Sequence, residues 1–131
     1  MDYKELVNLA ADARKKSISP YSNFKVGAAL LTEDGKVYEG ANIENATYGL
    51  TICAERTALF AALLAGERKF KAISVIGDDG GFCPPCGPCR QLLVEFCGPE
   101  LDVILRKSEG DLQIIKMKEL LPLSFDGTFL K

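Results

Sequence analysis

Apolar residues near the start of the chain recur at helical spacing, at Leu6, Leu9, Ala10 and Ala13. This spacing predicts an amphipathic helix over about residues 2–16. A loop rich in Ser, Pro and Asn follows at 17–24. Residues 25–43 then show two apolar runs separated by Asp-Gly, which predicts a β-hairpin.

The rest of the chain alternates between helical and strand patterns. Residues 44–51 are polar and predict a loop, whereas residues 53–67 are rich in helix formers and end beside Gly66, which is suited to a helix C-terminus. Further elements are predicted as a strand at 71–77, a loop at 78–85, a helix at 87–96, strands at 101–107 and 112–117 around a turn at 109–111, and a short helix at 118–121 before the tail.

This order of elements predicts the fold class. Helices separate the strands in a way that covers both faces of one sheet, so we expect an α/β fold, a three-layer α–β–α sandwich with a five-stranded mixed sheet. The 131 residues show no internal repeat and no linker-like segment. We therefore expect a single domain over residues 1–131.

Composition narrows the possible partners. The chain is 47% hydrophobic and carries a net charge of −2, which indicates a packed core and gives no basic surface for nucleic acid polymers or membranes. The N-terminal segment lacks the apolar stretch of a signal peptide, and no apolar run reaches the ~18 residues of a membrane span. We expect a cytoplasmic protein.

The five cysteines and the absence of histidine restrict the chemistry. In a reducing compartment an odd number of cysteines favours metal binding or catalysis over a disulfide framework. Without histidine there can be no Ser-His-Asp triad, so any metal site must use Cys, Asp or Glu.

Three cysteines fall at predicted helix starts. Cys53 precedes one helix, and Cys86 and Cys89 open another, where the helix dipole and unpaired N–H groups stabilise thiolates. Three thiolates favour zinc, and a three-ligand zinc site leaves one position for water. Glu55, two residues after Cys53, can reach such a water as a general base.

Other interpretations of these residues remain open. Cys83 could complete a structural zinc module with four cysteine ligands, and a C-x-x-C pair could serve thiol redox chemistry. We also expect Arg56 or Arg90, each directly after a residue of the site, to donate a hydrogen bond to a thiolate and so offset the negative charge of the cluster.

The motifs C-A-E at 53–55 and P-C-G-P-C at 85–89 resemble the signature of zinc nucleoside deaminases. The stretches SPYSNFKVGAALL, GANIENATYGLTICAERTAL and PCGPCRQLL make the chain similar to cytidine deaminases of the short, homotetrameric type. The resemblance implies hydrolytic deamination of cytidine and deoxycytidine in pyrimidine salvage, with one zinc ion per subunit. A deaminase of the same fold acting on another nucleoside or a nucleoside antibiotic is the alternative.

The resemblance also implies roles for residues of the reacting centre. Cys53, Cys86 and Cys89 would hold zinc, and Glu55 would carry a proton from water to ring N3 and then to the leaving ammonia. The backbone of Ala54 would contact the carbonyl of the base.

Five further positions would complete the nucleoside site by the same resemblance. Asn42 and Glu44 would bind the ribose, and Phe24 would pack on the pyrimidine. Tyr48 and Phe125 would reach into the site of a neighbouring subunit.

The family motif does not require Cys83. A fourth thiolate would occupy the position that water needs, so a deaminase would keep Cys83 off the metal.

Overall fold

The computed structural model describes residues 1–78, 83–108, 111–125 and 127–130. The middle of the predicted loop at 78–85 and most of the turn at 109–111 lie outside the described residues. Five strands form one sheet: β1 (Val26–Thr32), β2 (Val37–Ala41), β3 (Phe70–Gly77), β4 (Asp102–Ser108) and β5 (Asp111–Lys116).

The strands lie in the order β2-β1-β3-β4-β5, so the sheet is mixed. β3 and β4 are parallel, and the other neighbouring pairs are antiparallel. A parallel pair needs a crossover, and α3 (Gly87–Cys97) supplies it between β3 and β4. The five-stranded mixed sheet predicted from the sequence is therefore confirmed.

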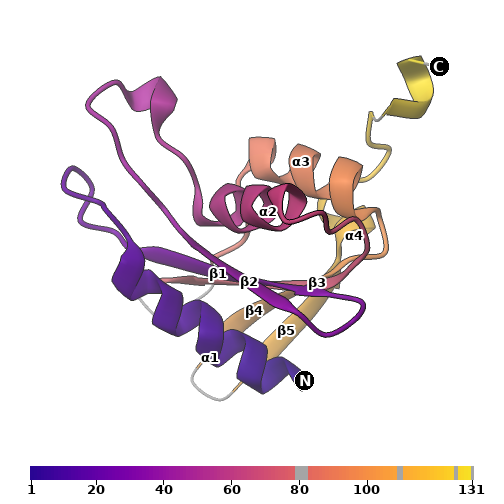
Figure 1. Cartoon of the computed structure of the whole chain (residues 1–131), viewed down its shortest axis with the longest axis horizontal. Helices are drawn as coiled ribbons and strands as arrows, with labels where there is room; N and C mark the ends of the chain where they lie inside the picture. The colour runs from indigo at the N-terminus through magenta and orange to yellow at the C-terminus, as the bar shows by residue number, and fades with distance from the viewer. Residues whose placement is uncertain (79–82, 109–110, 126, 131) are drawn as a thin grey trace.

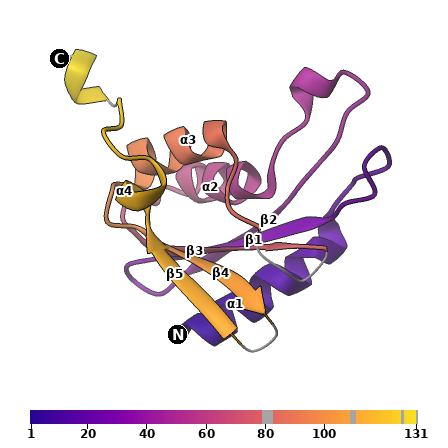
Figure 2. The ribbon, with the colours of Figure 1, turned by 180° about the vertical axis from the view of Figure 1, so that it is seen from behind.

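Helices cover both faces of the sheet (Figure 1). On one face lies α1 (Tyr3–Ala13), which a short 3-10 turn, η1 (Arg14–Lys16), extends to the predicted length. On the other face lie α2 (Ala54–Leu64), α3 and the short α4 (Met117–Leu120), as the view from behind also shows (Figure 2). The predicted α–β–α layering is confirmed.

Each face of the sheet has its own apolar core. The core under α1 contains Leu6, Ala10, Leu31 and Ile76, whereas the core under α2 and α3 contains Leu30, Leu59, Ile73 and Leu93. The central strand β3 contributes to both because successive side chains of a strand point to opposite faces. Within the described residues, no helix has the length and apolar composition needed to cross a bilayer.

Glycines let two helices approach the sheet closely. A Cβ at Gly27 of β1 would overlap the Ala10 carbonyl oxygen of α1. A Cβ at Gly40 of β2 would overlap the Ala54 carbonyl oxygen of α2, so only glycine fits beneath the first turn of that helix. This contact fixes the start of α2 against the sheet.

The C-terminal end of α2 matches the expectation for Gly66, which has φ +95°. The N–H of Gly66 donates to the Leu63 carbonyl, and the N–H of Glu67 donates to the Ala62 carbonyl. These two bonds form a Schellman motif, the usual glycine-terminated helix end.

Two of the segments that extend away from the body of the molecule concern the predicted site (Figure 1). One connects β2 to α2 and contains the 3-10 turn η2 (Tyr48–Leu50). The other is the tail after α4, which contains η3 (Gly127–Leu130). Both segments carry residues that the sequence assigned to a nucleoside site.

Candidate functional site

The three cysteines predicted to act together lie at the N-terminal ends of α2 and α3. Cys53 is the N-cap of α2, Cys86 is the N-cap of α3, and Cys89 lies in the first turn of α3. Pro88 occupies one of the first positions of α3, where its missing N–H costs no intrahelical bond. The positive ends of two helix dipoles therefore converge on the three sulfurs.

The sulfurs are close enough to bind one metal ion. The Sγ atoms of Cys53 and Cys86 are 3.7 Å apart, and those of Cys86 and Cys89 are 3.1 Å apart. All three sulfurs lie within 4.8 Å of one another. Tetrahedral zinc with Zn–S bonds of ~2.3 Å requires sulfurs ~3.8 Å apart, so the three thiols fit that ion with small adjustments.

The thiols also differ in their acidity. A hydrogen bond with the Cys89 thiol lowers the pKa of Cys53 to about 5 against the effect of burial, and Arg56 and Cys86 contribute further. The same hydrogen bond, together with burial, raises the pKa of Cys89. The low pKa of Cys53 favours its thiolate form, which is the form that binds a metal.

Glu55 lies in the first turn of α2 and is only 5% exposed, although it is a carboxylate. Burial raises the pKa of Glu55, and the negative charge of Cys53 adds to the shift. A raised pKa makes a carboxylate a better proton acceptor, which is what a general base needs. Glu55 lines the same cavity as Cys53 and Cys86, and its role as a general base stays a prediction.

Of the two candidate arginines, Arg56 contacts a sulfur. Its Nη2 donates to Cys53 Sγ at 3.4 Å and to the Thr51 carbonyl at 3.5 Å. The hydrogen bond to Cys53 raises the pKa of Arg56. Arg90 instead donates to the backbone carbonyls of Pro85 and Leu120. Arg90 therefore braces the Cys86 segment against the end of α4.

A cavity of about 210 Å³ opens beside the sulfurs. Its lining comes from β1, from the end of β2, from the start of α2 and from the segment before α3: Val26, Asn42, Thr51, Ile52, Cys53, Ala54, Glu55, Cys83, Pro84 and Cys86. The group of three metal-ligand sulfurs found among the described residues does not include Cys83.

Asn42 borders this cavity but is largely engaged by the protein. Its Oδ1 accepts from the Ser17 hydroxyl and the Val26 N–H, and its Nδ2 donates to the Phe24 carbonyl at 2.9 Å. The side chain is 9% exposed. Because both acceptor positions are used, one Nδ2–H remains for a ligand.

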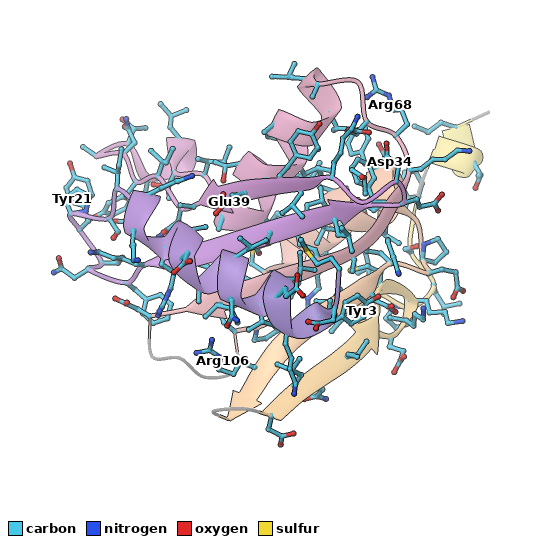
Figure 3. All side chains as sticks on the ribbon, turned by 60° about the horizontal axis from the view of Figure 1, so that its bottom comes forward. Tyr3, Tyr21, Asp34, Glu39, Arg68 and Arg106 are labelled. Carbon is cyan, nitrogen blue, oxygen red and sulfur yellow. The ribbon has the colours of Figure 1, made fainter. Side chains whose placement is uncertain are left out.

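Glu44 and Tyr48 line a second cavity, of about 370 Å³, together with Tyr21, Ser22 and Thr51. Glu44 accepts from the backbone N–H groups of Tyr21 and Ser22 and from the Ser22 hydroxyl, and the Ser22 bonds chiefly lower its pKa. The rings of Tyr48 and Tyr21 form a T-shaped pair with centroids 6.2 Å apart, and Tyr21 lies at the periphery of the molecule (Figure 3).

Thr51 lines both cavities and so places them side by side. Thr51 was not predicted from the sequence as a residue of the site. Its position between the N-I-E-N-A and C-A-E stretches was the available signal.

Phe24 and Phe125 lie in different surroundings. A Cβ at Gly77 would meet the Phe24 ring at 2.9 Å and Cys83 Sγ at 3.2 Å, so ring and sulfur share the end of β3. Phe125 is 57% exposed in the tail, where its carbonyl accepts from Gln91 of α3. The structure thus brings together the cysteines, Glu55, Arg56, Ala54 and Asn42, and places Glu44 and Tyr48 at the adjoining cavity.

Comparison with known proteins gives consistent matches. Residues 1–104 match the model of the family described as cytidine and deoxycytidylate deaminase zinc-binding region. The chain is 52% identical to a cytidine deaminase of Halalkalibacterium halodurans, over 95% of each chain. It is 47% identical to one of Sporosarcina psychrophila, over 95% of this chain and 92% of the other.

The fold has a close match among solved structures. A cytidine deaminase from Burkholderia pseudomallei superimposes with a TM-score of 0.90 at 52% identity, over 95% of this chain and 100% of the other.

Proposed function

The chain belongs to the cytidine and deoxycytidylate deaminase family, and we propose that it hydrolyses cytidine and deoxycytidine to uridine and deoxyuridine with release of ammonia. The observation that carries the proposal is the buried Glu55 carboxylate beside three converging thiols at one cavity. Residues 1–131 would form one catalytic domain of a zinc enzyme that serves pyrimidine salvage.

Zinc would be held by Cys53, Cys86 and Cys89. When bound, it supplies Lewis acidity that lowers the pKa of a water molecule. Arg56 donates a hydrogen bond to Cys53 and so reduces the negative charge on that thiolate. This would keep the zinc ion an effective Lewis acid despite its three thiolate ligands.

Glu55 would move the protons of the reaction. Its raised pKa lets it take a proton from water as the C4–O bond forms and pass that proton to ring N3. A second proton from the same oxygen would return through Glu55 to the exocyclic nitrogen as the C4–N bond breaks. The leaving group is then neutral ammonia.

The nucleoside would span the two adjoining cavities. The base would fill the cavity at the sulfurs, with its carbonyl at the N-terminal turn of α2 near Ala54. The remaining Nδ2–H of Asn42 would bind a ribose hydroxyl, and the ribose would extend past Thr51 toward Glu44. Phe24, at the end of β3, would pack against the pyrimidine.

Deamination can be tested by following cytidine absorbance with the zinc-loaded wild type, Glu55→Gln and the control Glu95→Gln, whose side chain is exposed on α3. We expect turnover by the wild type and the control, near-complete loss in Glu55→Gln, and equal zinc content in all three. Zinc-loaded wild type that leaves cytidine unchanged would refute the proposal.

We further propose a homotetramer in which subunits share their active sites. Tyr48 is 75% exposed and Phe125 is 57% exposed, and both lie on segments that extend from the body (Figure 1). Exposed aromatic side chains on projecting segments are suited to pack on a neighbouring copy.

Subunit mixing tests the shared site. Phe125→Ala and Glu55→Gln should each be inactive alone, because each lacks one part of every site. Co-assembled from separate chains, they should regain measurable activity, because some sites then combine an intact Glu55 with a neighbour's intact Phe125. Light scattering should give four chains per particle; a monomer, or no recovery on mixing, would contradict the shared site.

We propose a cytoplasmic location because of the thiol chemistry of the zinc site. The three ligand thiols must stay reduced to bind zinc, and the cytosol keeps thiols reduced.

A further inference from the structure

The reaction orients the base within the cavity at the sulfurs. C4 must face the sulfur cluster, and its neighbour N3 must face Glu55. C5, the other neighbour of C4, then points away from Glu55. The start of α2, with Glu55, forms one part of the cavity wall. The segment before α3, with Cys83 and Pro84, forms another part.

Cys83 is placed at this wall by the end of β3. Its Sγ lies 3.2 Å from the point where a Gly77 side chain would begin, next to the Phe24 ring. The residue is half-buried and also packs against the core beneath α2 and α3. Its side chain therefore lies between that core and the cavity.

Because Cys83 lines the same cavity from the segment before α3, whereas Glu55 lines it from the start of α2, we propose that Cys83 is a specificity-determining residue that contacts the C5 edge of the pyrimidine and limits the size of substituents there. The inference rests on the proposed cytidine deaminase activity. It gives Cys83 a role that is independent of zinc, for which Cys53, Cys86 and Cys89 already suffice.

A series of side-chain sizes at Cys83 tests the contact. We expect the ratio of kcat/KM for 5-methylcytidine to that for cytidine to rise in Cys83→Ala and to fall in Cys83→Leu. The two variants should differ by about tenfold or more, the usual effect of a methyl-sized change in an apolar pocket. The ratio for 2′-deoxycytidine should stay constant, because that substrate differs only at the ribose.

Alkylation of the wild-type holoenzyme gives a second readout that needs no folded variant. Uridine, the reaction product, should slow the labelling of Cys83 by iodoacetamide, measured by peptide mass spectrometry. Labelling of Cys97 should not change, because that residue lines a cavity with β4 and β5 residues.

The outcomes separate the two proposals. Wild type that does not deaminate cytidine overturns the proposed function. The neighbouring variant Pro84→Ala is measured in the same way. If the wild type deaminates cytidine but the ratio of kcat/KM for 5-methylcytidine to that for cytidine stays constant across the Cys83 series, or changes only in Pro84→Ala, the role of Cys83 is overturned. If Cys83→Leu fails to fold, unchanged labelling of Cys83 in the presence of uridine overturns it as well.

Discussion

Replacing Glu55 by glutamine should make the folded protein more stable at neutral pH while it removes activity. The side chain is 5% exposed, and burial raises its pKa above the ordinary value of a glutamate, with the charge of Cys53 adding to the shift. Three thiolates around a divalent cation leave a net negative charge, so bound zinc does not remove this repulsion. Glutamine has nearly the same shape and cannot ionise.

The sign of the pH dependence follows from the raised pKa. Below the unfolded value Glu55 is protonated in both states, and the wild type suffers no penalty. As the pH rises through the folded value, the wild type loses stability because the carboxylate ionises more readily in the unfolded chain. The advantage of Glu55→Gln should therefore grow with pH and then level off.

The magnitude follows from the burial of the group. An incompletely compensated buried polar group costs about 1–3 kcal/mol and a charged one costs more, so we take the excess cost of the carboxylate over the glutamine amide as about 1–3 kcal/mol. For a chain of this length, 1 kcal/mol corresponds to about 3–4 °C in Tm, so we expect a gain of roughly 3–10 °C at pH about 8.

Thermal unfolding of zinc-loaded wild type, Glu55→Gln and the exposed control Glu95→Gln, at equal protein and zinc concentrations, measures the effect. In the wild type, kcat/KM should rise with pH while stability falls. The activity rises because Glu55 must be ionised to accept a proton. A Tm of Glu55→Gln at or below that of the wild type at pH about 8 would refute the reasoning, as would an advantage that does not shrink at acidic pH.

Three other changes separate roles near the site. Arg56→Ala should lower kcat about tenfold or more with zinc retained, because it removes a charged hydrogen bond to a thiolate. Arg90→Ala loses only hydrogen bonds to backbone carbonyls, so the folded protein should keep a kcat within about twofold of wild type. Equal losses of kcat in the two variants would contradict a specific role for Arg56. Cys83→Ser should keep both zinc and cytidine turnover, and loss of zinc measured by mass spectrometry would instead support a closed site with four cysteine ligands. Gly40→Ala should destabilise the fold by about 2 kcal/mol or more, because its Cβ would overlap the α2 backbone. Gly49→Ala meets nothing within 4 Å and serves as the control for chemical unfolding; equal midpoints for the two glycine variants would contradict the close packing.

Much of the fold followed from local patterns. The hairpin, the helix that ends at Gly66 and the helix that opens at Cys86 were predicted because periodicity, turn residues and helix ends depend on neighbours in the chain. The strand order β2-β1-β3-β4-β5 had no such signal, since it depends on packing between segments far apart in sequence.

The candidate site divides in the same way. The reacting groups could be named from the chain alone, because Cys86 and Cys89 share one helix start and Glu55 follows Cys53 within one turn. Family resemblance named Asn42 and Glu44 together, but the structure places them at adjoining cavities that meet at Thr51. Both side chains also bind the loop between η1 and β1.

The chemistry available at each helix start is a property of the sequence, since the spacing along the chain fixes the thiols and the carboxylate. Folding was needed to bring Cys53 to Cys86, to place Arg56 rather than Arg90 at a sulfur, and to leave Cys83 on the cavity wall outside the cluster. The physical reason is that these positions depend on how α2 and α3 pack beside each other on one face of the sheet. Their distances are set by how closely both helices pack on the strands, and that packing depends on the whole core.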